Sequence, residues 1–361
     1  MWHQLRAFCS EVASDQRVRA VVLTGAGDHF CAGGDITEFE TRIATLGRDH
    51  GIPGFSAAIV SDGRIVWAKG FGVADVQTGA AATPETLYHL ASLTKTFAST
   101  VIQQLVDEGK VGLDDPVSSY GISLGGQGIV RVRHLLTMTS EGVPGSAYSY
   151  NGDRFGLLDS VIARGSGQPF ARALTERILV PAQLSRTAAN PLNTASFALA
   201  GLDPALVQAK LARGYSVNAQ NSASPIAYPS YFGSAAGMIS STTDIATYSI
   251  ALDGTLLLSA QAKERAFTPT KSTGGDTLPY AMGWFSQDYF GEKVVWHYGL
   301  WIGNSSILVR VPARGLTFVI LANSDGLASR ANLGGGKLLS SPFATEFLRA
   351  FVEAGLHIPA T

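Results

Sequence analysis

Residues 90–100 read LASLTKTFAST and place one serine, Ser92, three positions before a lysine, Lys95. No helix breaker separates the two residues, so we expect a helix that carries the hydroxyl and the amine on one face. Ser92 would lie near the helix N-terminus, where free N–H groups favour developing negative charge. A serine hydroxyl becomes a good nucleophile when a base removes its proton, and a neutral lysine can be that base. The alternative is a chance pair of two common surface residues, because short motifs often match by accident.

The composition favours a well-packed globular protein and excludes several classes of function. The chain has 361 residues, of which 46% are apolar and 15% charged, and its net charge is -1. Because there is no basic excess to neutralise phosphates, we expect no nucleic-acid partner. No apolar run is long enough to span a membrane, and the first residues lack the apolar core of a secretory signal. We therefore expect a cytoplasmic protein without a disulfide framework, since the two cysteines, Cys9 and Cys31, both stand near the N-terminus.

Residues 18–36, which read VRAVVLTGAGDHFCAGGDI, resemble a known enzyme family. They are similar to the crotonase (enoyl-CoA hydratase) family, in which the segment matching 32–35 supplies one oxyanion-hole N–H for an acyl-CoA thioester. Gly34 is the matching donor. The second donor and the catalytic carboxylates of that family have no counterpart downstream, and one N–H is half an oxyanion hole. We therefore expect residues 1–36 to be a crotonase-like fragment, from a gene fusion or a misplaced start, and not a CoA enzyme.

The remaining residues predict a sheet that is assembled from both ends of the chain. Thr37 and Glu40 have the spacing of a capping box for a first helix. Asp62-Gly63 predicts a hairpin turn between two strands, residues 55–61 and 64–72. Further strands are expected at 280–287, 293–299, 304–311 and 316–324. Their short connections favour an antiparallel meander.

The middle of the chain, residues 117–275, has helical patterns and many loops. Helices are expected at 132–138, 155–162, 170–178 and 242–252, and a last one at 344–354. We therefore predict one domain over residues 37–361, with a sheet part (37–116 and 276–361) and an inserted helical part (117–275).

Six stretches between residues 41 and 361 resemble one enzyme family. They are GIPGFSAAIV (51–60), YHLASLTKTF (88–97), LDDPVSSY (113–120), VRHLLTMTSEG (132–142), AAGMISSTTDIATY (235–248) and VVWHYGLWIGNSSILVRVP (294–312). This part of the chain is similar to the class C β-lactamase-like serine hydrolases, which include family VIII carboxylesterases and low-molecular-weight penicillin-binding proteins. The resemblance implies an α/β (α+β) fold of the β-lactamase/penicillin-binding-protein type, with an antiparallel sheet flanked by helices and an inserted helical domain. It implies no cofactor and no metal.

The resemblance also implies roles for the residues around Ser92. Ser92 corresponds to the acylated nucleophile and Lys95 to its base. The second motif of the family is a tyrosine before a helix, which here is Tyr150, with Tyr148 as the alternative. A tyrosine beside a lysine can carry the proton from the serine to the leaving group if that neighbour lowers its pKa.

The third motif of the family corresponds to His297-Tyr298-Gly299, on a strand expected to face the site. Gly299 would let the substrate approach the strand backbone. The N–H of Leu300 would join the N–H of Ser92 to form the oxyanion hole. An ordinary buried histidine at a strand edge is the alternative interpretation of His297.

Two other motifs have the wrong context for catalysis. Ser123 lies in G-I-S-L-G, which fits the G-x-S-x-G pattern, but that pattern requires a buried strand before the serine and a helix after it. Here a proline turn precedes the serine and GGQG follows it. Lys271 begins K-S-T-G, which resembles the lactamase K-T-G triad but lies in a glycine-rich segment between a helix and a strand. We expect both to be loop residues.

Two departures from the lactamase pattern indicate the substrate. Gly152 stands where lactamases of this type carry an asparagine, and His297 stands where they carry a lysine, so an amide and a charge for the lactam are absent. Losing one charge-assisted contact weakens the binding of a carboxylate-bearing lactam by about 1.5–3 kcal/mol. An uncharged ester makes no such contact and loses no binding free energy. Four aromatic residues are candidates for an apolar pocket: Trp301, Tyr298, Tyr231 and Phe232. We therefore expect a carboxylesterase with a small-molecule ester substrate. The alternatives are a β-lactamase or D-alanyl-D-alanine-type penicillin-binding protein with weak turnover, or an inactive binder of peptidoglycan-like ligands.

Overall fold

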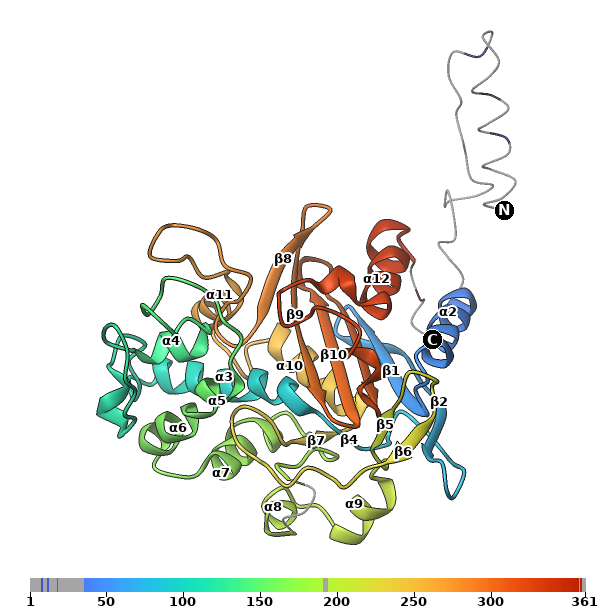
Figure 1. Ribbon diagram of the computed structural model, residues 1–361, viewed down its shortest axis with the longest axis horizontal. Coiled ribbons are helices and arrows are strands. Elements are labelled where there is room, and N and C mark those ends of the chain that lie inside the picture. The colour runs from blue at the N-terminus through green and yellow to red at the C-terminus, as the bar shows by residue number, and fades with distance from the viewer. Residues whose placement is uncertain are drawn as a thin grey trace.

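The computed structural model describes residues 36–190, 194–356 and 358, together with Phe8, Val12 and Val18. Apart from Phe8, Val12, Val18 and Ile36, the proposed crotonase-like fragment (1–36), including Gly34, therefore lies outside the described residues. Within them an antiparallel sheet of seven strands is flanked by helices, as predicted (Figure 1). Across the sheet the strands are β3 (Ala80–Ala81), β2 (Arg64–Asp75), β1 (Gly54–Ser61), β11 (Leu316–Ala322), β10 (Asn304–Val311), β9 (Glu292–Trp301) and β8 (Phe285–Tyr289).

The centre of the sheet joins the two ends of the described chain. Strand β1 pairs with β11 in antiparallel register, with Phe55 opposite Ala322, and pairs with β2 on its other side. The β1–β2 hairpin turns at Asp62 and Gly63, whose φ angles are 49° and 73°. Two successive left-handed residues are typical of a type I′ turn, so the predicted hairpin is confirmed.

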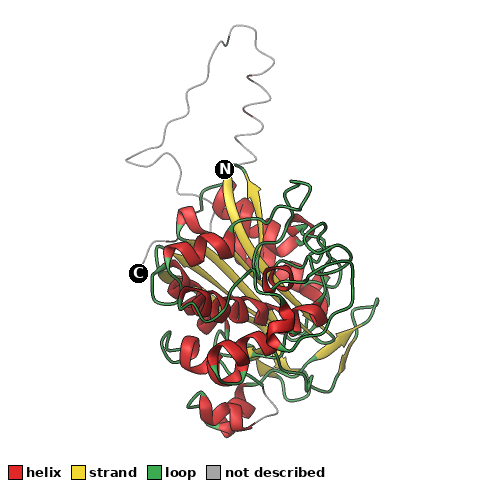
Figure 2. Cartoon of the chain, turned by 90° about the vertical axis from the view of Figure 1, so that its left-hand side faces the viewer, coloured by secondary structure: helices red, strands yellow, loops and turns green. Residues whose placement is uncertain are grey.

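Helices cover both faces of the sheet (Figure 2). Successive residues of a strand point to opposite faces, so two neighbouring residues of β11 can show what lies on each side. Phe318 on β11 contacts the ring of Phe39 on α2 (Ile36–Asp49) and the ring of Phe347 on α12 (Pro342–Leu348). Its neighbour Thr317 is within hydrogen-bond distance, 2.8 Å, of Ser249 on α10 (Thr242–Asp253), on the other face. The sheet is therefore a buried middle layer.

The other helices lie mostly to one side of the sheet, where α4 to α7 form a group in Figure 1. They are α3 (Thr94–Asp107), α4 (Val132–Leu136), α5 (Gly152–Gly156), α6 (Leu158–Ser166), α7 (Phe170–Leu174), α8 (Thr194–Leu199), α9 (Pro204–Lys210) and α11 (Ala260–Phe267). Two small sheets pair β4 (Tyr88–His89) with β7 (Ile239–Ser240), and β5 (Tyr215–Val217) with β6 (Ala223–Pro225). Helices α8, α9 and α11 were not expected. Helix α10 belongs in sequence to the proposed helical part but packs on the sheet, and the division into two parts stays a prediction.

The expected capping box at Thr37 is wrong. Helix α2 already begins at Ile36, so Thr37 lies inside the helix. The carboxylate of Glu40 accepts hydrogen bonds from the Trp67 indole (2.7 Å) and the Lys69 ammonium, both on β2. The Glu40 carboxylate therefore binds partners that are distant in sequence instead of completing a capping box with Thr37.

Strand β8 begins five residues later than expected, at Phe285. Before it the chain turns at Gly283, whose φ is 83° and whose N–H donates to the Leu136 carbonyl at 3.0 Å. A Cβ on Gly283 would lie 2.5 Å from the Cβ of Ser99 on α3. Close packing against α3 therefore prevents the segment from continuing as a strand.

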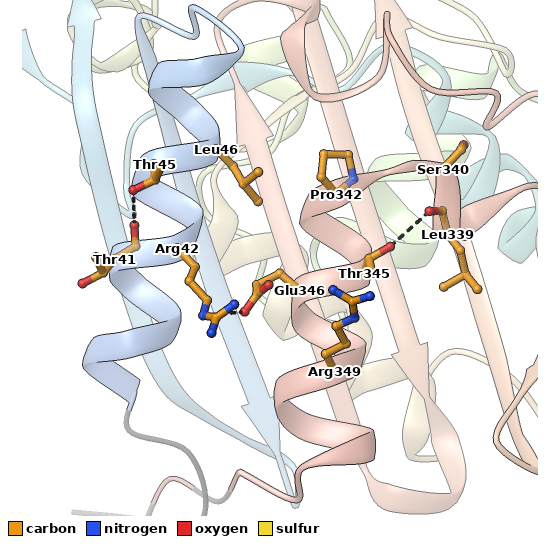
Figure 3. A pocket seen from close by; sticks show the side chains of 10 residues that line it. All are labelled: Thr41, Arg42, Thr45, Leu46, Leu339, Ser340, Pro342, Thr345, Glu346 and Arg349. Atoms are coloured by element: carbon orange, nitrogen blue, oxygen red, sulfur yellow. Dashed lines mark hydrogen bonds and ion pairs between the residues drawn. The ribbon is translucent and has the colours of Figure 1, made fainter. Parts of the chain in front are cut away.

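A surface groove of about 490 Å³ runs between α2 and α12 (Figure 3). Arg42 from α2 and Glu346 from α12 form an ion pair across it, with 3.3 Å between the guanidinium and the carboxylate. None of the predicted catalytic residues lines this groove.

The described part of the chain has no helix that is both long and apolar enough to cross a bilayer. Among the same residues, no three His, Cys, Asp or Glu side chains form a group that could hold a metal ion.

Asn323 connects three strands at one end of the sheet and gives a test of the fold. Its buried amide accepts from Gly54 N–H (2.8 Å) and donates to the carbonyls of Val73 (3.0 Å) and Ala74 (3.2 Å). We expect Asn323→Ala to lower the free energy of unfolding by about 2–4 kcal/mol, because buried backbone groups lose their partners. Urea unfolding measures the loss.

The matched control is Asn332→Ala, which removes an exposed side chain that accepts one hydrogen bond, from Gly335 N–H. It should change the free energy of unfolding by about 0.5 kcal/mol or less. Equal losses in the two variants would contradict the role given to Asn323.

Candidate active site

Ser92 lies in a single 3-10 turn, Ala91–Leu93, directly before α3. The expectation of one continuous helix is therefore corrected at its first turn. Ala91 has a φ of 49°, a left-handed conformation that is rare for a residue with a Cβ, and it immediately precedes Ser92. Such strained residues persist only where surrounding contacts hold them, and they are concentrated at functional sites.

Lys95, in the first turn of α3, points its amine at Ser92. The distance from Lys95 Nζ to Ser92 Oγ is 2.9 Å, and a second hydrogen bond of 2.7 Å goes to the Ala235 carbonyl. The Lys95 side chain is 1% exposed and its ammonium lies over the rings of Tyr150 and Phe155, at 5.4 and 5.5 Å. Burial lowers the pKa of Lys95 to about 7, although the charge of Asp153 acts in the opposite direction. A large fraction of this lysine is therefore neutral near neutral pH.

Tyr150 is the tyrosine that faces this pair. Its buried hydroxyl has no hydrogen bond of good geometry among the described residues, and it is directed toward the hydroxyls of Ser92 and Tyr298. Tyr148 instead donates to the carbonyl of Gly334 at 2.6 Å, away from Ser92. Burial, which outweighs the other influences, raises the pKa of Tyr150 well above its usual value. The condition of a lowered pKa is therefore not met, and Tyr150 is a neutral phenol.

His297 is fully buried on β9, with both ring nitrogens hydrogen-bonded inside the protein. One nitrogen is 2.8 Å from the Tyr280 hydroxyl and the other is 2.7 Å from the Tyr298 carbonyl. Burial lowers its pKa to about 3, and the charge of Lys95 adds to this effect, so the ring is neutral. A direct substrate contact of this side chain would require it to release one of these bonds.

Gly299 on β9 lies directly against the turn that carries Ser92. A Cβ at this position would lie 2.0 Å from the Leu90 carbonyl and 3.1 Å from the Cβ of Ala91. The absence of a side chain therefore lets the Ser92 turn come close to strand β9, and the expected role of Gly299 in substrate approach stays a prediction. Ser306 on β10 donates to the same Leu90 carbonyl at 2.8 Å and fixes this contact.

The register of β9 shows where the N–H of Leu300 points. Trp301 pairs with Asn304 across a two-residue turn, and such a turn closes with a hydrogen-bonded pair. Because hydrogen-bonded and non-hydrogen-bonded pairs alternate, Leu300 opposite Ser305 belongs to the second kind. Its N–H therefore points away from β10, and β8 pairs with β9 only as far as Trp296. The N–H of Leu300 lies on the open edge, beside the Ser92 turn.

Aromatic side chains adjoin the open edge of β9. The ring of Trp301 stacks on that of Tyr231, with centroids 6.0 Å apart and planes inclined by 14°. Phe232, the residue after Tyr231 in the sequence, stacks on Phe170 of α7. Tyr298 is mostly buried against the Tyr150 ring, with centroids 5.7 Å apart, so it contributes little exposed surface.

The structure also brings in residues that the sequence did not single out. The Ala235 carbonyl orients the amine of Lys95, and Thr94 Oγ1 donates to the Ala91 carbonyl at 2.8 Å. His89 Nδ1 accepts from the Ala91 N–H at 3.1 Å. Both stretches that contain these residues, 88–97 and 235–248, carry part of the family resemblance, but the resemblance assigned no role to His89, Thr94 or Ala235.

The two motifs judged out of context lie on loops. Ser123 is exposed and has neither a strand before it nor a helix after it. Lys271 is exposed in a turn-rich segment, while the strand beside Ser92 is β9. Gly152, at the start of α5, is open: a Cβ there would meet only the amine of Lys95, at 3.8 Å.

Comparison with known proteins agrees with this arrangement. The model of the Beta-lactamase family matches residues 39–338. Penicillin-binding protein 4* of Bacillus subtilis is 25% identical over 332 residues, which cover 79% of this chain and 71% of that protein. Protein flp of Staphylococcus aureus is 26% identical, with coverage of 75% and 60%, and D-aminopeptidase of Brucella anthropi is 24% identical, with coverage of 73% and 55%. The chain thus spans less than two thirds of the length of the last two.

Solved structures show the same fold. The octameric penicillin-binding protein homologue from Pyrococcus abyssi has a TM-score of 0.75 at 24% identity, covering 90% of this chain and 78% of that one. D-alanine carboxypeptidase AmpC from Burkholderia cenocepacia has a TM-score of 0.70 at 20% identity, covering 87% and 100%. The family match spans most of the chain, the fold agrees, and Ser92 and Lys95 meet as the family requires. The chain therefore belongs to the Beta-lactamase family and is a serine hydrolase.

Proposed function

We propose that this protein is a serine carboxylesterase that hydrolyses short-chain esters through an acyl-enzyme on Ser92. The observation that carries the proposal is the buried Lys95 amine, 2.9 Å from Ser92 Oγ, whose pKa is lowered to about 7. A neutral amine has one lone pair and two N–H bonds. One N–H can keep the bond to the Ala235 carbonyl while the lone pair takes the proton of Ser92.

In the acylation step, Ser92 Oγ bonds to the ester carbonyl carbon as its proton passes to Lys95. The negative charge that develops on the carbonyl oxygen is stabilised by the N–H groups of Ser92 and Leu300. The bond between the carbonyl carbon and the alkoxy oxygen then breaks. The alcohol leaves with a proton from Tyr150, which is replaced by the proton on Lys95. Water attacks the acyl-enzyme in the reverse sense and releases the acid.

A raised pKa suits Tyr150 for this part of the cycle. A phenol that stays protonated can donate to the departing alkoxide, which is far more basic than it is. Its hydroxyl is directed toward those of Ser92 and Tyr298, which supports this role.

The surroundings of the site favour an uncharged substrate. Position 152 has no amide side chain, His297 is neutral, and at the end of β9 the partly buried Trp301 stacks on the exposed Tyr231. A carboxylate-bearing lactam would lack the charged contact worth about 1.5–3 kcal/mol, whereas a neutral ester would lose nothing.

The second candidate is a β-lactamase or penicillin-binding protein of the D-alanyl-D-alanine type with weak turnover. The names of the relatives, penicillin-binding protein 4* and D-aminopeptidase, favour it. The two candidates are separated by measuring kcat/KM for p-nitrophenyl esters, a chromogenic cephalosporin and a D-alanyl-D-alanine peptide on one preparation. Faster turnover of the peptide or the cephalosporin than of the esters would replace the first proposal by the second.

The first prediction compares two serines. We expect Ser92→Ala to lower ester hydrolysis about a thousandfold or more, because no nucleophile remains. Ser123→Ala should stay within about twofold of the wild type, since Ser123 is exposed on a loop. Steady-state rates with p-nitrophenyl butyrate test both. An inactive Ser123→Ala with an active Ser92→Ala would reject the assignment.

The second prediction concerns pH. Lys95 must lose its proton to act as a base, so kcat/KM for a neutral ester should rise about tenfold per pH unit below about pH 7 and level off above it. Burial holds the pKa of His89 to about 4 and that of His297 to about 3, so neither titrates in this range. A rate that keeps rising to about pH 10, near the usual pKa of lysine, would contradict a buried base.

The third prediction concerns Gly152. Because a Cβ there would meet only Lys95 Nζ at an ordinary contact distance of 3.8 Å, Gly152→Asn should fold and place an amide beside the site. We expect the ratio of cephalosporin to ester kcat/KM to rise about five- to tenfold, as one hydrogen bond is gained. Gly152→Ala, which adds bulk without an amide, is the control and should leave the ratio within about twofold. An equal change in both variants would show that the amide is not responsible.

A further inference from the structure

We propose that His89 is a positioning residue that sets the spacing between the two N–H groups of the oxyanion hole, those of Ser92 and Leu300. This inference rests on the proposed function, in which Ser92 is acylated. His89 is the last residue of strand β4, three positions before the nucleophile, and its ring is completely buried.

The first contact of His89 acts on the Ser92 turn. The Ala91 N–H donates to His89 Nδ1 at 3.1 Å, and Ala91 is the left-handed residue whose φ is 49°. The peptide that follows Ala91 carries the N–H of Ser92, so the conformation of Ala91 determines where that N–H points. A left-handed alanine is unfavourable by itself and needs such a contact to hold it.

The second contact acts on strand β9. The edge of the His89 ring packs against Trp301, with centroids 6.0 Å apart and planes inclined by 68°, and against Tyr228, at 5.5 Å and 74°. Trp301 directly follows Leu300, the second donor. One imidazole therefore contacts the residue before the first donor and the residue after the second.

The protonation state of His89 supports this role. Burial lowers its pKa to about 4, so the ring is neutral, and Nδ1 must be the unprotonated nitrogen because it accepts from Ala91. The proton is then on Nε2, which is buried without a hydrogen-bond partner among the described residues. A buried unpaired polar group costs stability that an apolar ring would avoid. The histidine differs from an apolar ring in having Nδ1, which accepts the hydrogen bond from the Ala91 N–H.

The test compares two amides that differ by one methylene. In His89→Asn the side-chain oxygen can occupy the place of Nδ1, whereas in His89→Gln it reaches the place of Nε2. Both variants lose the ring contact with Trp301, and only His89→Asn keeps an acceptor for the Ala91 N–H. We therefore expect kcat for p-nitrophenyl butyrate to fall about fivefold in His89→Asn and about thirtyfold or more in His89→Gln. KM should change by about twofold or less in both, because the defect concerns the transition state.

Three further measurements separate positioning from a general loss of structure. Titration with a phosphonate that labels the serine should give the same number of active sites per chain in both variants. The affinity for a boronic acid, which forms a tetrahedral adduct resembling the intermediate, should fall in His89→Gln in step with kcat. The melting temperatures of the two variants should be similar.

Equal kcat in His89→Asn and His89→Gln would overturn the inference, as would a loss that follows only the fraction of titratable sites. Ser92→Ala separates this inference from the proposed function. If Ser92→Ala hydrolyses the ester at the wild-type rate, the proposed function fails and the inference fails with it. If Ser92→Ala is inactive while His89→Gln keeps the wild-type kcat, only the role of His89 is rejected.

Discussion

The close approach of the Ser92 turn to strand β9 is the contact on which the site depends. It exists because Gly299 has no side chain: a Cβ there would lie 2.0 Å from the Leu90 carbonyl. Ser306 then holds that carbonyl, and Thr94 holds the next one. The open edge of β9 is thereby placed beside the nucleophile, and two backbone N–H groups from distant parts of the sequence can face one carbonyl oxygen. Backbone donors held in this way need no reorganisation when charge develops.

The electrostatic character of the site follows from burial rather than from charge pairing. Lys95 is enclosed by aromatic rings and a carbonyl, and desolvation outweighs the attraction of Asp153, so its pKa falls to about 7. The same low-polarity surroundings raise the pKa of Tyr150 and lower that of His297. One environment therefore yields a neutral base, a neutral phenol and a neutral imidazole, which is consistent with acyl transfer to and from uncharged groups.

The parts of the fold that depend on neighbouring residues could be predicted from the sequence. The hairpin at Asp62-Gly63 needs only two left-handed residues, and the spacing of Ser92 and Lys95 fixes their contact within one helical turn. Features that depend on distant partners were missed. Glu40 binds β2 instead of capping α2, and Gly283 bends the chain because it packs on Ser99. The direction of the pKa shift of Tyr150 could not be predicted either, because burial by surrounding rings is not visible in a linear motif.

The pairing of β1 with β11 in the middle of the sheet has a consequence for biosynthesis. Phe55 is paired with Ala322, so the central strands can form only after the chain up to residue 322 has left the ribosome. Contacts between such remote segments slow folding, because a long loop must close before they are gained. Until residues 292–301 have also emerged, the nascent chain carries Ser92 without β9, the strand that holds the second proposed oxyanion donor, the N–H of Leu300. Until then apolar strands such as β1 stay unpaired and expose apolar surface. Such surface promotes aggregation, which chaperones prevent.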